Sequence, residues 1–169
     1  NLNIQLIEEG KKPLAIGIGI NTGRVVVGNM GSDQRFDYTC LGDGVNLAAR
    51  LEGQTKAYGV GILLGQETVN LIHNKFKFIE LDKIAVKGKK EGITVYTVLT
   101  DQFNYMLHDT FLTHYKNRDW VKAENTLNKS IKENTELEFY YNMMKDRVAD
   151  LKSNDPGEDW DKVYRAISK

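Results

Sequence analysis

The sequence has one cysteine, no excess of either charge and no long apolar run, and each absence excludes a class of protein. Cys40 cannot form an internal disulfide, which indicates a reducing compartment, so we expect a cytoplasmic location. The 23 basic residues balance 23 acidic ones, and we predict no nucleic-acid partner because such binding needs a concentrated basic field. No apolar run approaches the about 20 residues that cross a bilayer.

Glycine is almost absent from the last part of the chain, and this divides the sequence into two regions. After Thr100 the only glycine is Gly157, whereas the earlier region is rich in glycine and β-branched residues. The later region predicts helices with aromatic residues along them. We therefore expect one domain at 1–100 and a helical tail at 101–169. The chain opens with an asparagine in a helix-like stretch, so we expect it to be a piece of a longer protein.

The glycine-rich region predicts a sheet with helices. Apolar residues at every second position of 14–20, isoleucine at three of them, with small residues between, are typical of a strand that another backbone or a ligand can approach closely. After Asp43, which we interpret as a helix cap, apolar residues recur with helical spacing to about Ala57. Further strands are expected at 24–28, 35–41, 59–64, 76–87 and 92–99, and a short helix at 66–73. This order predicts an α+β fold with the helices packed on one side of the sheet.

Two polar residues on the helix after Asp43 could bind a phosphate group. Asn46 and Arg50 are four residues apart, so both lie on one helix face. The guanidinium of Arg50 has forked donors suited to phosphate oxygens, and Asn46 can donate to an oxygen or orient a hydroxyl. On spacing alone, two solvated residues on an outer helix face are the commoner interpretation.

Three motifs in this region closely resemble the catalytic domain of class III adenylate/guanylate cyclases. They are GIGINTG at 17–23, LGDGVNLAARL at 41–51 and the turn VKGK at 86–89. The resemblance covers residues 1–99 with no forced gaps and is to the bacterial type of the family. It implies that the chain is the C-terminal part of that ferredoxin-like catalytic domain, followed by a small all-α tail.

The resemblance implies a role for four residues. Asn46 matches the asparagine that orients the ribose and stabilises the transition state, and Arg50 matches the arginine that neutralises charge on the α-phosphate. Lys87 matches the lysine that binds the terminal phosphates. Thr39 occupies the position of a purine-reading side chain and favours adenine. Guanylate cyclases typically have a cysteine there, so a register slip of one residue, to Cys40, would favour guanine.

The implied reaction is the conversion of ATP to cyclic AMP and pyrophosphate in intracellular signalling. This family uses two Mg²⁺ or Mn²⁺ ions, held by two aspartates upstream of the 17–23 motif. Neither aspartate motif occurs in this chain, so we predict no metal ligands here and no activity for the piece alone. The histidines also lack metal-ligand spacing, and we interpret all three as ordinary polar residues: His73, His108 and His114.

The resemblance also implies a homodimer with active sites at its interface, in which one protomer supplies the metal aspartates and the other the residues named above. Missing sheet strands would leave unpaired edges, which favours dimerisation. Two alternatives stay open. One is a guanylate cyclase, and the other is a degenerate cyclase-like module that binds a nucleotide or a regulatory partner without turnover.

The region after residue 101 has the spacing of aromatic, small and apolar residues that resembles one tetratricopeptide-type helical hairpin at 102–133. A third helix is expected at 136–152. One repeat cannot bury its own face, so the hairpin must pack on the third helix, on the cyclase domain or on a partner protein. The segment 155–164 resembles the closing motif of bacterial cyclases whose catalytic domain follows transmembrane helices. It suggests the cytoplasmic part of a membrane-anchored parent.

Overall fold

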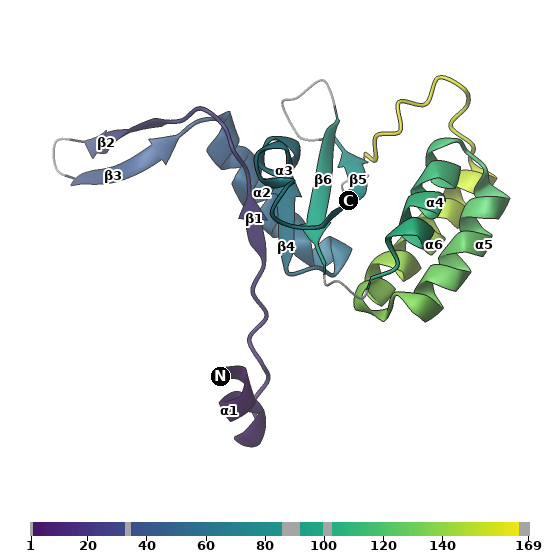
Figure 1. Ribbon diagram of the computed structural model, residues 1–169. Helices are drawn as coiled ribbons and strands as arrows, with labels where there is room; N and C mark the ends of the chain where they lie inside the picture. Colours follow the sequence, from purple (N-terminus) through teal and green to yellow (C-terminus); the bar gives the residue numbers. More distant parts are fainter. Residues whose placement is uncertain (1, 33–34, 86–91, 100–102, 166–169) are drawn as a thin grey trace.

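The computed structural model describes residues 2–32, 35–85, 92–99 and 103–165. Figure 1 shows a central sheet, a long two-stranded arm on one side and a group of tail helices on the other. The helices and strands, in chain order, are α1 (Leu2–Glu8), β1 (Ile18–Ile20), β2 (Val26–Ser32), β3 (Arg35–Leu41), α2 (Asp43–Tyr58), β4 (Ile62–Gly65), α3 (Gln66–Ile72), β5 (Phe78–Ile84), β6 (Ile93–Val98), α4 (Tyr105–Lys116), α5 (Trp120–Glu133), the 3-10 helix η1 (Thr135–Leu137) and α6 (Glu138–Ser153).

The central sheet has four strands in the order β1-β4-β6-β5. Strand β1 runs parallel to β4, while β6 is antiparallel to both β4 and β5. Strand β5 carries a bulge between Glu80 and Asp82. The predicted α+β class is confirmed, and the strands lie close to their predicted positions, although β1 is limited to the last three residues of 14–20.

Helix α2 lies directly on β1 because the strand has glycine at the contact. A Cβ atom on Gly19 would come within 2.1 Å of the carbonyl oxygen of Ala48. The side chains of Leu47 and Leu51 are buried between the helix and the sheet. The prediction that the glycines of 14–20 admit a second backbone is therefore confirmed.

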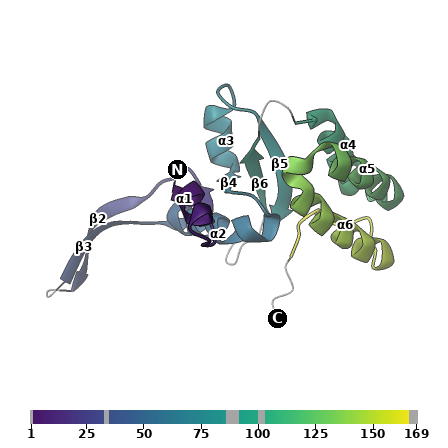
Figure 2. The same ribbon diagram turned by 90° about the horizontal axis from the view of Figure 1, so that it is seen from below.

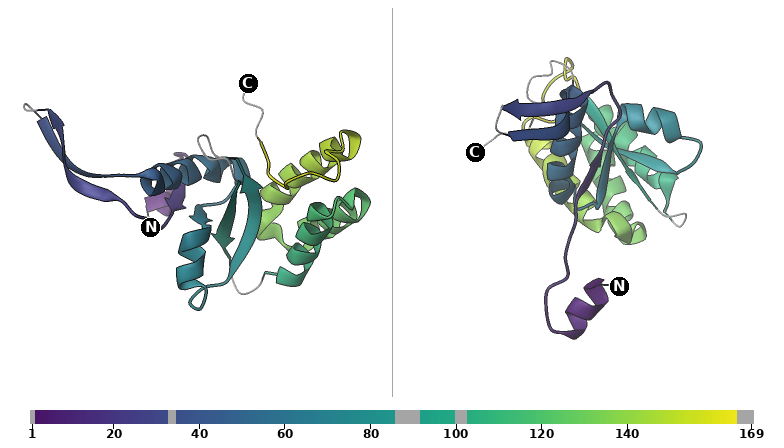
Figure 3. Two further views of the ribbon diagram at one scale, coloured as in Figure 1. Left: turned by 90° about the horizontal axis from the view of Figure 1, so that it is seen from above. Right: turned by 90° about the vertical axis from the view of Figure 1, so that its left-hand side faces the viewer.

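The prediction that the helices pack on one side of the sheet is wrong. Figures 2 and 3 show α2 and α3 on opposite sides of it. The reason lies in β4, where the neighbouring residues Leu63 and Leu64 point to opposite faces and are both buried. Leu63 pairs with Gly19 on the face that α2 covers, and Leu64 lies on the other face, where Tyr96 of β6 donates a hydrogen bond to Gln66 of α3. Both faces need cover, and one helix supplies it on each.

The turn from β3 into α2 depends on Gly42. The prediction that Asp43 caps the helix is wrong. Gly42, with φ 151° and ψ 163°, precedes α2, and Asp43 is the first helical residue. These torsion angles are nearly restricted to glycine. The helix ends at Tyr58, one residue beyond the predicted end.

Strands β2 and β3 form an antiparallel arm that projects away from the central sheet (Figure 1). Strand β2 continues to Ser32, past the predicted end at residue 28. Large apolar side chains are exposed along the arm, among them Val26, Phe36 and Tyr38. An exposed apolar surface on an extended hairpin is typical of a protein interface.

The tail consists of the predicted helical hairpin, α4 and α5, followed by α6. The aromatic residues Phe111, Tyr115 and Trp120 are buried, in agreement with the predicted packing on a third helix. One apolar core continues from this group into the central sheet. The domain boundary at residues 100/101 stays a prediction, and it falls in 100–102, outside the described residues.

The tail also covers the outer edge of β5. Its side chains donate to two strand carbonyls, from His108 Nε2 to Glu80 (2.7 Å) and from Tyr140 Oη to Leu81 (2.7 Å). Tyr164 adds a short parallel bridge, in which its N–H donates to the carbonyl of Lys83 at 2.7 Å. An uncovered strand edge would present unpaired backbone groups, so the tail completes the sheet at this end. The interpretation of His108 as an ordinary polar residue is wrong, because its ring is buried.

Within the described ranges, no helix combines the length and the apolar character that crossing a bilayer requires.

Candidate functional site

The first turn of α2 is anchored to the sheet by the loop after β1. Asn21 Nδ2 donates to the carbonyl of Gly44 at 3.2 Å, and the hydroxyls of Thr22 and Thr68 are 3.1 Å apart. The Asn21 amide also fills the space beside Gly65, where a Cβ atom would lie 2.4 Å from Asn21 Oδ1. Asn21 is a residue for which the sequence alone predicted no role. The signal was present in the 17–23 motif, since a polar residue there directly follows a strand.

The last turn of α2 is anchored on the other side of the molecule. Tyr58 Oη donates a 2.6 Å hydrogen bond to Asp82 Oδ2 of β5. Burial, and then the negative charge of Asp82, raise the pKa of Tyr58 well above its usual value, so the phenol stays protonated and remains a donor. Helix α2 is therefore held at both ends by side chains of the fold.

Asn46 and Arg50 lie one turn apart on the exposed side of this anchored helix. The next residue after each, Leu47 and Leu51, is buried against the sheet, which sets the rotation of the helix about its axis. Both predicted residues are exposed, so the structure brings them together on a surface that a ligand can reach. An amide and a guanidinium at this spacing can together bind phosphate and hydroxyl oxygens.

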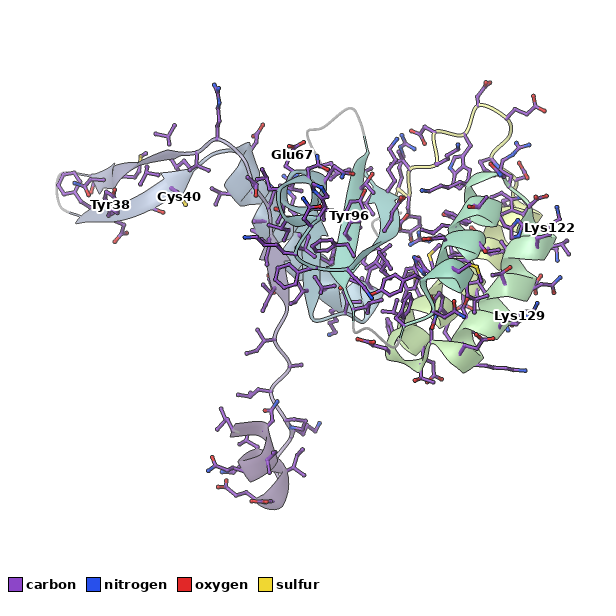
Figure 4. All side chains as sticks on the ribbon, viewed as in Figure 1. Tyr38, Cys40, Glu67, Tyr96, Lys122 and Lys129 are labelled. Atoms are coloured by element: carbon purple, nitrogen blue, oxygen red, sulfur yellow. The ribbon has the colours of Figure 1, made fainter. Side chains whose placement is uncertain are left out.

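Thr39 lies on the arm, apart from the α2 pair. It is exposed and pairs with Gly28 across the hairpin. Figure 4 shows its neighbours Tyr38 and Cys40 on the arm, away from the helix. Because side chains alternate along a strand, Thr39 and Cys40 point to opposite faces of the arm. Lys87, the fourth predicted residue, lies in 86–91, outside the described residues.

The described part of the chain contains no group of three or more His, Cys, Asp or Glu side chains placed to hold a metal ion.

The sequence of this site and its setting match one known family. The family model of the adenylate and guanylate cyclase catalytic domain matches residues 2–100. The chain belongs to this family. The match includes the arm, α2 and the whole central sheet, and it ends before the tail helices.

Similar proteins from several organisms are adenylate cyclases. An adenylate cyclase of Anabaena cylindrica is 40% identical over 99 residues, which are 57% of this chain and 20% of that protein. The terminal-differentiation specific adenylate cyclase of Dictyostelium discoideum is 41% identical over 86 residues, which are 49% of this chain and 4% of that protein. The crystal structure of the adenylyl cyclase CyaB from P. aeruginosa is similar with a TM-score of 0.53 and 43% identity, over 59% of this chain and 50% of that one. The chain thus spans a fifth or less of these two relatives and half of the crystallised chain.

Proposed function

We propose that this chain supplies the substrate-binding and transition-state-stabilising half of an adenylate cyclase active site. The parent protein would convert ATP to cyclic AMP and pyrophosphate as an intracellular signal. The observation that carries the proposal is the exposed pair Asn46 and Arg50 on a helix that is anchored at both ends. Its support from sequence is the identity of 40% or more to adenylate cyclases over this segment.

In this reaction the ribose 3′-oxygen attacks the α-phosphorus, and the bond from that phosphorus to the bridging oxygen of pyrophosphate breaks. Arg50 would donate to the α-phosphate oxygens, on which charge develops, while Asn46 would orient the ribose. Preorganised donors of this kind stabilise a transition state because they need no rearrangement during the reaction. Thr39 would contact the adenine, and Lys87 the terminal phosphates.

Two Mg²⁺ or Mn²⁺ ions would activate the 3′-hydroxyl and bind the phosphates when present. We place their ligands outside this chain, and so propose that the 169 residues alone have no activity. A homodimer with the active sites at its interface is supported by the apolar side chains exposed on the arm. We also propose a cytoplasmic location, and the contact of the tail with a partner protein stays a prediction.

The test is nucleotide turnover by a longer piece of the parent protein that includes the segment upstream of this chain. ATP and GTP are offered separately with Mn²⁺. We expect cyclic AMP, and a loss of about 100-fold or more in kcat for Asn46→Ala and for Arg50→Ala. The matched control is Lys56→Ala, an exposed cation on the same helix, which should leave kcat within about twofold.

Each other result identifies an alternative. A cyclic product from GTP alone would support the guanylate cyclase. Absence of turnover by a folded, dimeric protein would contradict the enzyme and support the degenerate module.

A further inference from the structure

The tail lies beyond the family match, yet it reaches the helix that carries Asn46 and Arg50. The link is the carboxylate of Asp82 on β5. Its Oδ2 atom accepts from Tyr58 of α2 at 2.6 Å and from Arg147 of α6 at 2.5 Å. The side chains of Asp82 and Arg147 are only 1% and 8% exposed, so the ion pair lies in the interior.

A second contact joins the same two helices. Gly59 ends α2 in the left-handed conformation, with φ 66°. Phe139, in the first turn of α6, lies so close to Gly59 that a Cβ atom there would come within 2.4 Å of its ring. Figure 2 shows the start of α6 beside the end of α2. The end of α2 therefore contacts both the tail and the sheet.

Arg147 is itself held in place from its other side. Its guanidinium lies over the ring of Tyr164, with the central carbon 3.5 Å from the ring centroid. Tyr164 in turn forms the parallel bridge with Ile84, two residues from Asp82. The Asp82 carboxylate also accepts from the backbone N–H of Lys83 at 2.8 Å, through Oδ1. A buried carboxylate with these partners has a definite orientation, because losing any one would leave a polar group unsatisfied.

We propose that the tail is a positioning element of the nucleotide site, in which Tyr58 and Arg147 act through Asp82 to set the place of α2. Tyr58 lies eight residues after Arg50, about 12 Å along a rigid helix. A slide or rotation of α2 at its last turn is therefore transmitted to Arg50 and Asn46. A displacement of about 1 Å at a reacting group can lower a rate about 100-fold. The structural part of this inference stands by itself, and its consequence for catalysis rests on the proposed function.

The structural part is tested by amide hydrogen exchange on the 169-residue chain. Tyr58→Phe removes the hydroxyl that joins α2 to Asp82 and leaves the Asp82–Arg147 pair in place. Tyr140→Phe is the matched control, since it also removes one buried hydroxyl bonded to β5, at the carbonyl of Leu81. We expect amide protection in α2 to fall about tenfold in Tyr58→Phe and to stay within about twofold in Tyr140→Phe. Equal protection of α2 in the two variants would overturn the inference.

The catalytic part is tested by the same two substitutions in the longer, active protein. Tyr58→Phe should lower kcat about tenfold and leave KM for ATP within about twofold, because a displaced Arg50 loses contacts to the transition state. Tyr140→Phe should retain both constants. A change in KM without a change in kcat, or an equal loss of kcat in both variants, would contradict the positioning role. If the unsubstituted protein had no turnover, the proposed function would fail, while the exchange result would still decide where α2 is held.

Discussion

Gly19 of β1 and Ala48 of α2 touch through their backbones. A Cβ atom at Gly19 would lie 2.1 Å from the carbonyl oxygen of Ala48 and 2.3 Å from the backbone nitrogen of Glu52. No side-chain movement can relieve such a contact, because both neighbouring atoms belong to the helix backbone. The distance between strand and helix, and with it the place of Asn46 and Arg50, depends on the absence of a side chain at residue 19.

We predict that Gly19→Ala displaces α2 and lowers the free energy of unfolding by about 1–3 kcal/mol or more, as overpacking of a core does. Urea unfolding followed by circular dichroism measures the change. The control is Gly28→Ala on the arm, where a Cβ atom meets nothing within 4 Å, and its effect should be within about 0.5 kcal/mol. Equal effects of the two substitutions would mean that the strand and helix separate without cost.

The buried pair of Asp82 and Arg147 predicts a large loss of stability when its cation is removed. Arg147→Met keeps much of the side-chain volume but leaves the Asp82 carboxylate buried without a positive partner, so we expect a loss of about 3–5 kcal/mol. The control is Lys152→Met, which removes an ion pair with Glu124. The side chain of Lys152 is 47% exposed and that of Glu124 is 38% exposed, so the loss should be less than about 1 kcal/mol.

A second substitution separates charge from packing in the same experiment. In the Arg147→Met background, Asp82→Asn removes the unpaired charge and should recover part of the lost stability. Two results together would show that the Asp82 carboxylate is not buried. They are no recovery of stability in the double variant, and a loss of stability in Arg147→Met no larger than that in Lys152→Met.

The strands, helices and motif residues could be predicted because their signals are local. The helical period after Gly42 places Asn46 and Arg50 on one face, and the alternation in 14–20 marks β1. The attachment of the tail had no such signal. Asp82 and Arg147 are 65 positions apart, and neither lies in a pattern that identifies its partner. The burial of both faces of β4 was not predictable for a similar reason. The contacts that place α3 on the second face are not encoded in the local alternation of apolar residues.

The candidate site was predictable in part. Asn46 and Arg50 lie together as expected, because one helix carries both. The separation of Thr39 from them was not predictable, since it depends on the direction of the arm, which no local sequence pattern encodes. His108 was also missed, because a histidine in an amphipathic helix can be solvated or buried, and only the contact with β5 decides which.

His108 predicts a dependence of stability on pH. Its Nε2 donates to the carbonyl of Glu80, and its Nδ1 lies 2.9 Å from the hydroxyl of Tyr141, which suits a neutral ring. Burial lowers the pKa of His108; the Glu80 carbonyl and Asp109 oppose this, and Lys116 adds to it. Below about pH 6.5, the usual pKa of histidine, the unfolded chain binds a proton that the folded chain does not.

The free energy of unfolding should therefore fall as the pH is lowered from about 7.5 to 5.5, by at most about 1.4 kcal/mol per pH unit from this group. Urea unfolding at several pH values measures the slope. His108→Gln should flatten it, whereas His73→Gln, at an exposed position, should leave it unchanged. If the dependence of stability on pH persisted in His108→Gln, other titratable groups would be its cause.

The arm predicts self-association through exposed apolar side chains. Tyr38 of β3 is 77% exposed, and an apolar ring held out on a hairpin gains stability when a second copy covers it. Tyr38→Lys places a charge there and should weaken association of the chain about tenfold or more, measured by sedimentation equilibrium. The control is Met106→Lys on α4 of the tail, a residue 79% exposed, which should leave the dissociation constant within about twofold. If Met106→Lys weakened association and Tyr38→Lys did not, the interface would lie on the tail, and the arm would need another partner.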